Sequence, residues 1–228
     1  SRAPGPPALS APSPGPPPAP GRRRAPWKTG PVNDFADHSP RARGGSATSI
    51  VIRPASPDDV TRVARLLALR GTGAEDALAQ APRMIEALPV LLLALAPIGQ
   101  GAGEDVDDDR LAPVALSGAF VLPGDPGAGR PERWTVSGLV VDPEARRHGI
   151  GRALLGAVLD AVAALDPGEP VVSVVDADKH ASIGLHLAVG FTQTERVEEY
   201  AGVTFEGGQG VVMVHEPAPE TAGEPGGE

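Results

Sequence analysis

Apolar positions along this chain fall into two patterns, short continuous runs and stripes at helical spacing. The helical spacing predicts helices that begin near 56, 75, 150 and 179. The short runs predict strands, because they are rich in β-branched residues and bounded by Gly, Pro or Asp. These predicted strands span 48–53, 90–96, 111–122, 133–141, 170–175 and 191–197, with a last strand or hairpin between 200 and 215. The order predicts a mixed α/β domain.

The first two predicted helices carry local signals of their own. Ser56, Pro57 and Asp59 provide a capping hydroxyl, a proline in the first turn and an acid three residues after the cap. The second helix, over 75–88, contains Pro82. Proline has no backbone N–H to donate, so we expect this helix to break or restart there. Asp178 precedes the last predicted helix, and we expect it to cap that helix.

The stretch LVVDPEARRHGIGRALL, over 139–155, predicts a binding site for an anion. A buried strand ends at Asp142 and Pro143, and a short loop rich in Arg and Gly then enters a helix. The start of a helix leaves several N–H groups unpaired where the helix dipole favours an anion, and glycines let a phosphate approach the main chain. Each well-placed arginine adds charge-assisted hydrogen bonds of roughly 1.5–3 kcal/mol. We therefore expect a phosphate or pyrophosphate cradle here.

Composition limits the folded part of the chain. Of 228 residues, 29 are Gly and 27 are Pro, which is too many for one compact domain throughout. The sequence predicts a disordered tail over 1–47 that is rich in Pro, Ala, Gly and Arg, a folded domain over 48–216, and a second disordered tail over 217–228.

Charge and cysteine content exclude several classes of function. The net charge of −9 argues against a nucleic-acid partner. The absence of Cys excludes disulfides, thiolate metal sites and a thiol nucleophile. The aspartates at 105–109 lack the spacing of a calcium loop, so we expect no metal. The longest apolar run is too short to span a bilayer and no signal peptide is evident, so we expect no membrane partner and a cytoplasmic location.

Three motifs resemble those of the GNAT superfamily of N-acetyltransferases. The central one is R-R-H-G-I-G from Arg146 to Gly151, preceded by LVVDPEA. The others are the opening segment IRPASPDDV and the segment DADKHASIGLHLAVGF, which is similar to the branch that includes phosphinothricin acetyltransferase. The resemblance covers about 48–214. A dinucleotide-binding loop fits less well because the loop is one glycine short, and a P-loop is excluded because no G-K-S/T follows.

The resemblance implies the acyl-CoA N-acyltransferase fold, an α/β fold whose central, mostly antiparallel sheet has splayed fourth and fifth strands and about four flanking helices. It implies direct transfer of acetyl from acetyl-CoA to an amine within a ternary complex, with a small molecule or amino acid as acceptor. Two alternatives stay open: acetylation of a protein N-terminus or lysine, and a non-catalytic domain that senses acetyl-CoA. Members of the family are often homodimers.

The resemblance also assigns roles to individual residues. The pantetheine arm would pair with the backbone of Val140 and Val141, and the Leu139 N–H would polarise the thioester carbonyl. His186 replaces the usual tyrosine as the proton donor to the leaving thiolate; packing beside the cofactor is its alternative role. The glutamate that many relatives use as a base on the fourth strand is missing, since WTVS occupies 134–137. The pyrophosphate would bind the loop residues, which are Arg146, Arg147, His148, Gly149, Gly151 and Arg152.

Overall fold

The computed structural model describes residues 50–98, 110–124, 127, 129, 131–205 and 209–217. The predicted tails over 1–47 and 217–228 lie outside the described residues, apart from residue 217. Most of the aspartate-rich loop, over 99–109, also lies outside them.

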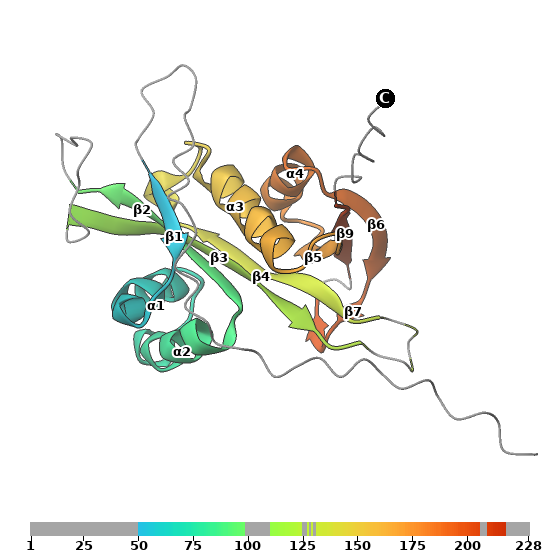
Figure 1. The fold of residues 1–228 in the computed structure, drawn as a ribbon, viewed down its shortest axis with the longest axis horizontal. Helices are drawn as coiled ribbons and strands as arrows, with labels where there is room; N and C mark the ends of the chain where they lie inside the picture. The colour runs from blue at the N-terminus through green and yellow to red at the C-terminus, as the bar shows by residue number, and fades with distance from the viewer. Residues whose placement is uncertain are drawn as a thin grey trace, which may run out of the picture. The chain divides into compact units, whose positions relative to one another are not determined.

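A seven-stranded mixed sheet forms the centre of the domain (Figure 1). Its strands are β1 (Val51–Pro54), β2 (Val90–Pro97), β3 (Leu111–Leu122), β4 (Arg133–Val141), β5 (Val171–Asp176), β6 (Thr192–Val197) and β9 (Gly210–His215). They are ordered β1-β2-β3-β4-β5-β9-β6, and all neighbours are antiparallel except β4 and β5, which are parallel. Strands β7 (Glu199–Tyr200) and β8 (Val203–Thr204) form a separate hairpin.

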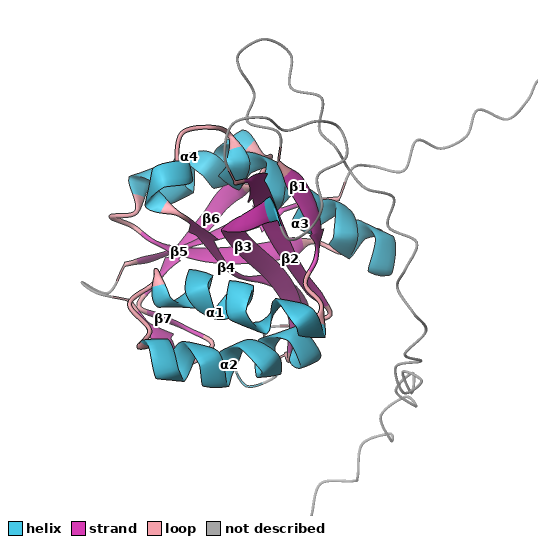
Figure 2. Ribbon diagram, turned by 90° about the vertical axis from the view of Figure 1, so that its left-hand side faces the viewer, coloured by secondary structure: helices cyan, strands magenta, loops and turns pink. Residues whose placement is uncertain are grey.

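Four helices cover the two faces of the sheet. They are α1 (Val60–Ala68), α2 (Ala74–Ala87), α3 (Ile150–Leu165) and α4 (His180–Ala188), and two short 3₁₀ turns, η1 (Pro57–Asp59) and η4 (Pro143–Ala145), precede α1 and α3. Figures 1 and 2 show α3 and α4 on one face of the sheet, and α1, α2 and β7 on the opposite face. The predicted mixed α/β architecture is confirmed.

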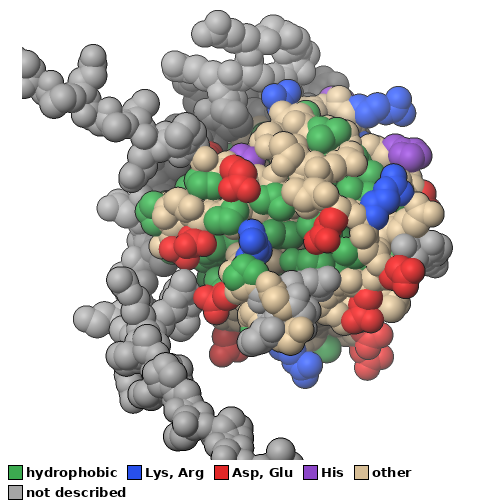
Figure 3. All heavy atoms as spheres, turned by 90° about the vertical axis from the view of Figure 1, so that its right-hand side faces the viewer, with side chains coloured by type: hydrophobic (Ala, Val, Ile, Leu, Met, Phe, Trp, Pro, Cys, Tyr) green, Lys and Arg blue, Asp and Glu red, His purple; other side chains and the backbone are tan. Residues whose placement is uncertain are grey.

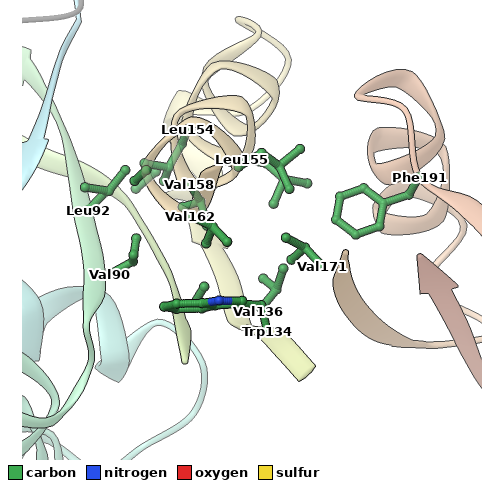
Figure 4. Packing of buried hydrophobic residues seen from close by; sticks show 14 of the residues in the cluster. Val90, Leu92, Trp134, Val136, Leu154, Leu155, Val158, Val162, Val171 and Phe191 are labelled. Atoms are coloured by element: carbon green, nitrogen blue, oxygen red, sulfur yellow. The ribbon is translucent and has the colours of Figure 1, made fainter. Parts of the chain in front are cut away.

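Each face of the sheet has its own hydrophobic core, because side chains alternate along the strands. On the α3 face, Figure 4 shows Trp134 and Val136 of β4 below Val158 and Val162 of α3. The indole N–H of Trp134 donates to Asp166 Oδ2 at 3.1 Å, so this residue has a core role rather than a place in an acceptor pocket. On the other face, a second core joins helices α1 and α2 to β2, β3 and β4; its fully buried members include Val63, Leu66, Leu67, Leu93 and Leu95.

The start of α1 is held by a buried carboxylate, as the capping signal predicts. Asp59 is 0% exposed and accepts hydrogen bonds from the backbone N–H and hydroxyl of Ser56, both at 2.9 Å. Arg53 Nη1 binds the same carboxylate at 2.6 Å, and Arg62 Nη1 binds it at 3.0 Å. Burial alone would raise the pKa of Asp59, but the hydrogen bonds from Arg53, Ser56 and Arg62 outweigh it and hold the pKa well below its ordinary value.

Two local expectations about helices are wrong. Helix α2 continues through Pro82 without a break. Pro82 is exposed, whereas Ala77 and Ala81 are fully buried, so packing of the helix face offsets the one missing backbone hydrogen bond. Asp178 was expected to cap α4, but the cap position is Lys179 and no side chain caps that end.

Candidate active site

Strands β4 and β5 part soon after they meet. The parallel pairing covers only Trp134 with Val171 and Thr135 with Val172. No pairing between the two strands is recorded for 136–141 of β4 or 173–176 of β5, which are all described residues. The splay that the resemblance implies is therefore present, and it leaves one edge of β4 without a strand partner.

A β-bulge redirects β4 where the gap opens. The register with β3 shifts between Ser117 and Ala119, so that Ser137 and Gly138 together lie opposite Gly118. Gly138 has φ +111°, a conformation that favours glycine, and its carbonyl accepts a hydrogen bond from Ser117 Oγ at 2.9 Å. In the sequence, the one local sign of this bulge is a glycine within an apolar strand.

The edge of β4 that faces the gap presents main-chain groups. The Asp142 N–H donates to Val114 O of the β3 side at 2.8 Å. Because amides alternate in direction along an antiparallel pair, the Val140 N–H also faces β3, and the N–H groups of Leu139 and Val141 face away from it. Two backbone donors thus point into the parted region, where an extended amide-containing ligand can pair with them.

The loop before α3 leaves its amides free. The N–H groups of residues 147–152 donate no hydrogen bond in the described part of the chain, and the first helical bond runs from Ala153 N–H to Gly149 O at 3.0 Å. Arg147 and Gly149 both have positive φ, at +66° and +78°, which turns successive amides toward one side of the loop. Arg146, Arg147, His148, Gly149 and Arg152 are exposed. This geometry fits an anion such as a diphosphate.

Neighbouring groups fix the loop in place. Arg146 Nε donates to Val141 O at 3.2 Å, and the Asp142 carboxylate accepts the Glu144 N–H at 3.0 Å. A Cβ on Gly151 would lie 3.1 Å from Leu185 Cδ1, so glycine lets α3 pack closely against α4 and β4. A groove of about 570 Å³ starts at Gly149 and follows the outer side of α3.

His186 lies in the core of the α4 side rather than at an open surface. It is 2% exposed; its Nδ1 is 2.8 Å from Ser182 O, and its Nε2 is 2.9 Å from Ser173 Oγ. A carbonyl only accepts, so Nδ1 carries the hydrogen and Nε2 accepts from the Ser173 hydroxyl. Burial lowers the pKa of His186, and the hydrogen bond to Ser182 opposes this effect less strongly. The ring also meets Phe191 edge-on at 5.0 Å.

Ser173 is a site residue that was missed in the sequence. It is 4% exposed and is the first residue of β5 beyond the paired segment. The one available signal was a serine in the otherwise apolar run PVVSVV. Its hydroxyl connects His186 to the point where the two strands separate.

Strand β4 itself carries no carboxylate, and the nearest acidic residues along the chain, Glu132 and Asp142, flank its two ends. Glu132 precedes β4 and is exposed. Asp176 and Asp178 flank the end of β5; their side-chain hydrogen bond raises the pKa of Asp176 and lowers that of Asp178. In the described residues no group of three His, Asp or Glu side chains is placed to hold a metal ion. None of the described helices is both long and apolar enough to cross a membrane.

Figure 3 shows the face of the molecule on the β6 side, where Asp and Glu side chains surround a central apolar area. This distribution agrees with the net charge of −9.

Comparisons with known proteins agree with this geometry. Residues 97–191 match the family model described as the acetyltransferase (GNAT) family. No curated protein matches the chain. The fold is similar to that of a GNAT superfamily phosphinothricin acetyltransferase from Sinorhizobium meliloti in complex with acetyl-CoA, at 21% identity and a TM-score of 0.51, covering 78% of this chain and 93% of that one.

Two further solved structures share the fold. NAA60 of Arabidopsis thaliana in complex with a bisubstrate analogue has 17% identity and a TM-score of 0.53, with 75% of this chain and 100% of that one covered. The NatC complex bound to Gag peptide and CoA has 12% identity and a TM-score of 0.51, with 74% and 99% covered. At these identities the likeness shows the fold alone.

Proposed function

We propose that this chain, whose residues 97–191 match the GNAT acetyltransferase family model, is an acetyltransferase of that family and transfers the acetyl group of acetyl-CoA directly to the amine of a small molecule or amino acid. The observation that carries the proposal is the combination of free amides at 147–152 with a parted β4–β5 pair beside them. A ligand with a diphosphate at one end and a peptide-like arm at the other matches both features.

Acetyl-CoA has these two parts. Its diphosphate would lie on the N–H groups of Arg147, His148, Gly149, Gly151 and Arg152, with the guanidinium of Arg146 nearby. The pantetheine arm would lie along the free edge of β4, where the Val141 N–H is directed toward the gap. Val140 belongs to the same strand, but its N–H faces β3 and not the gap.

Transfer would take place where the strands diverge. The Leu139 N–H faces the gap and would stabilise the oxyanion that forms when an amine attacks the thioester carbonyl. An alkyl amine with a pKa of ~10.4 must first lose a proton, at a cost of roughly 4–5 kcal/mol at pH 7. Since β4 carries no carboxylate, we propose that water in the gap takes this proton.

For His186 the contacts favour packing beside the cofactor over proton donation. Its Nε2 accepts from Ser173 in the neutral state, so it holds no ring proton directed at the gap. This supports a packing and positioning role for His186, which the hydrogen bond from the Ser173 hydroxyl holds in one orientation. The alternative, proton donation by His186 itself, requires the imidazolium, which burial disfavours.

The proposal also concerns the kind of acceptor, the oligomeric state and the cellular location. A peptide N-terminus or lysine is the second candidate acceptor, because the NatC structure of the same fold is bound to a peptide. A non-catalytic, acetyl-CoA-sensing domain is the third reading, motivated by the missing glutamate and tyrosine. We keep a homodimer and a cytoplasmic location as proposals.

The test is release of free CoA from acetyl-CoA by the full chain with a panel of amines, amino acids and peptides, with mass spectrometry of the products. We expect an acetylated small amine and CoA release that depends on it. Binding of acetyl-CoA without release in the presence of any acceptor would favour the sensing domain instead.

A further inference from the structure

The end of helix α1 places one arginine over the bulge of β4. Leu66 and Leu67 of α1 share a hydrophobic core with Val140 of β4. Arg70 lies in the turn that directly follows α1, three and four residues after these leucines, and Gly138 lies two residues before Val140 in β4. The packing of α1 on β4 thus places Arg70 next to Gly138.

The contact between them is close. A Cβ built on Gly138 would lie 3.0 Å from Nη1 and 3.3 Å from Nη2 of Arg70. The guanidinium therefore occupies the space that a side chain at Gly138 would need. Gly138 directly precedes Leu139, whose N–H faces the parted strands, so the positive charge lies beside the proposed transfer point.

The backbone holds this end of α1 firmly. The Arg70 N–H donates to Leu67 O at 3.0 Å, and the Gly71 N–H donates to Ala68 O at 3.1 Å. Gly71 has φ +89°, typical of the glycine that ends a helix. The helix terminus that carries Arg70 is thus a defined turn packed on the sheet.

The charge of Arg70 has no partner in the described part of the chain. No carboxylate, carbonyl or hydroxyl there accepts a hydrogen bond from its guanidinium, in contrast to Arg53 and Arg62, which bind Asp59. Arg70 is also exposed, and helix α1, which it follows, lies on the same face of the sheet as α2 and β7 (Figure 2). Its guanidinium is therefore a local positive charge on a protein whose net charge is −9.

We propose that Arg70 binds a carboxylate of the acceptor, so that the substrates are amines that also carry a carboxylate, such as free amino acids. A guanidinium matches a carboxylate with two parallel hydrogen bonds, which fixes the acceptor's orientation as well as its position. The proposal rests on the acetyl transfer proposed above. It favours a free amino acid over a protein N-terminus, which has an amide where the amino acid has its carboxylate.

The structural alternative is that Arg70 only complements the dipole at the end of α1. The two roles differ in what they affect: helix stability in one case, and discrimination between acceptors in the other. Kinetics on matched acceptors therefore separates them.

The experiment compares L-amino acids with their carboxamides as acceptors for the wild-type chain, Arg70→Ala, Arg70→Lys and the control Arg83→Ala, an exposed arginine of α2. We expect wild type and Arg83→Ala to use the best amino acid roughly 10- to 100-fold better, in kcat/KM, than its amide. Arg70→Ala should lose this preference, because its KM should rise for the amino acid and not for the carboxamide. Arg70→Lys should recover part of the preference. The melting temperature of each variant is recorded alongside.

Equal use of acid and amide by the wild type, or an unchanged preference in Arg70→Ala, would overturn the proposal. Acetylation of peptides or carboxylate-free amines only, or of no acceptor at all while acetyl-CoA still binds, would also overturn it. Failure to bind acetyl-CoA in calorimetry would instead refute the proposed function, so the two failures are distinguishable.

Discussion

His186 shows how its surroundings determine the chemistry of a single residue. The imidazole is buried, bonded through both nitrogens and packed on Phe191. Because burial disfavours the charged form, the folded protein holds this ring neutral. In the unfolded chain the same ring takes up a proton near its ordinary pKa of ~6.5.

This difference predicts a pH dependence of stability. The folded pKa of His186 lies below the unfolded one, so the unfolded chain binds more protons as the pH drops below ~6.5, and the free energy of unfolding falls in that range. We expect His186→Gln to be less stable at neutral pH and to lose part of this pH slope, as measured by urea unfolding between about pH 5 and 8. The control His180→Gln, at an exposed position, should keep the wild-type slope.

At this scale the sequence indicates the local features of the candidate site and gives no signal for the non-local ones. The unpaired amides before α3 could be predicted because the loop, its glycines and its helix are contiguous, and the binding role of Arg146 to Arg152 stays a prediction. Arg70 and Ser173 were not, because their roles depend on the packing of α1 on β4 and on the point where β5 leaves β4. The spacing of residues along the chain predicts neither this packing nor the point where the strands separate.

Among the elements, the loop before α3 carries the clearest consequence. Gly149 has φ +78°, and a Cβ built on it would meet no other atom within 4 Å. Glycine is therefore favoured here by the backbone conformation and not by close packing. Gly149→Ala should weaken acetyl-CoA binding roughly tenfold, since a shift of the loop misaligns its amides and ~1 kcal/mol of strain is added. Calorimetric titration with acetyl-CoA measures this effect.

The matched control is Gly184→Ala in α4, where a Cβ also meets open space but the backbone is helical. This variant should bind acetyl-CoA normally and gain about 0.5–1 kcal/mol of stability. Equal loss of affinity in both variants would show that the loop conformation is not what matters.

The turn from β1 to α1 makes a separate prediction about acid stability. The hydrogen bonds of Asp59 depress its pKa, so their contribution is present above the unfolded pKa of about 3.8 and is lost as the pH falls below it. Asp59→Asn should cost roughly 3 kcal/mol at neutral pH, because it removes a buried carboxylate that is the counter-charge of two half-buried arginines, Arg53 and Arg62. Urea unfolding checks this, with the exposed Asp58→Asn as control; a loss below ~0.5 kcal/mol in Asp59→Asn would contradict it.

Element boundaries were predicted well where the apolar pattern is continuous. Strands β3 and β4 begin and end where the pattern places them. The continuation of α2 through Pro82 and the bulge at Gly138 were not foreseen, because tertiary packing in the first case and strand register in the second override local preference.

In the whole molecule, the order of strands creates the site. β9, the last strand in the chain, lies between β5 and β6, so β5 is fully paired on that side and free of β4 beyond Val172. The sequence suggested a final strand or hairpin but not this insertion, since strand order depends on contacts distant in the chain. The result is a segment of β4 that is not paired with β5 and that extends from the bulge beside Arg70 to the loop before α3.

The central claim is that this gap and the α3 loop together hold acetyl-CoA by its diphosphate and its pantetheine arm. Isothermal titration of the full chain with CoA, and separately with pantetheine, which lacks the diphosphate, tests it most directly. We predict saturable binding of CoA and at least ~100-fold weaker binding of pantetheine, as several charge-assisted hydrogen bonds would be lost. No uptake of CoA, or equal affinity for both compounds, would contradict the claim.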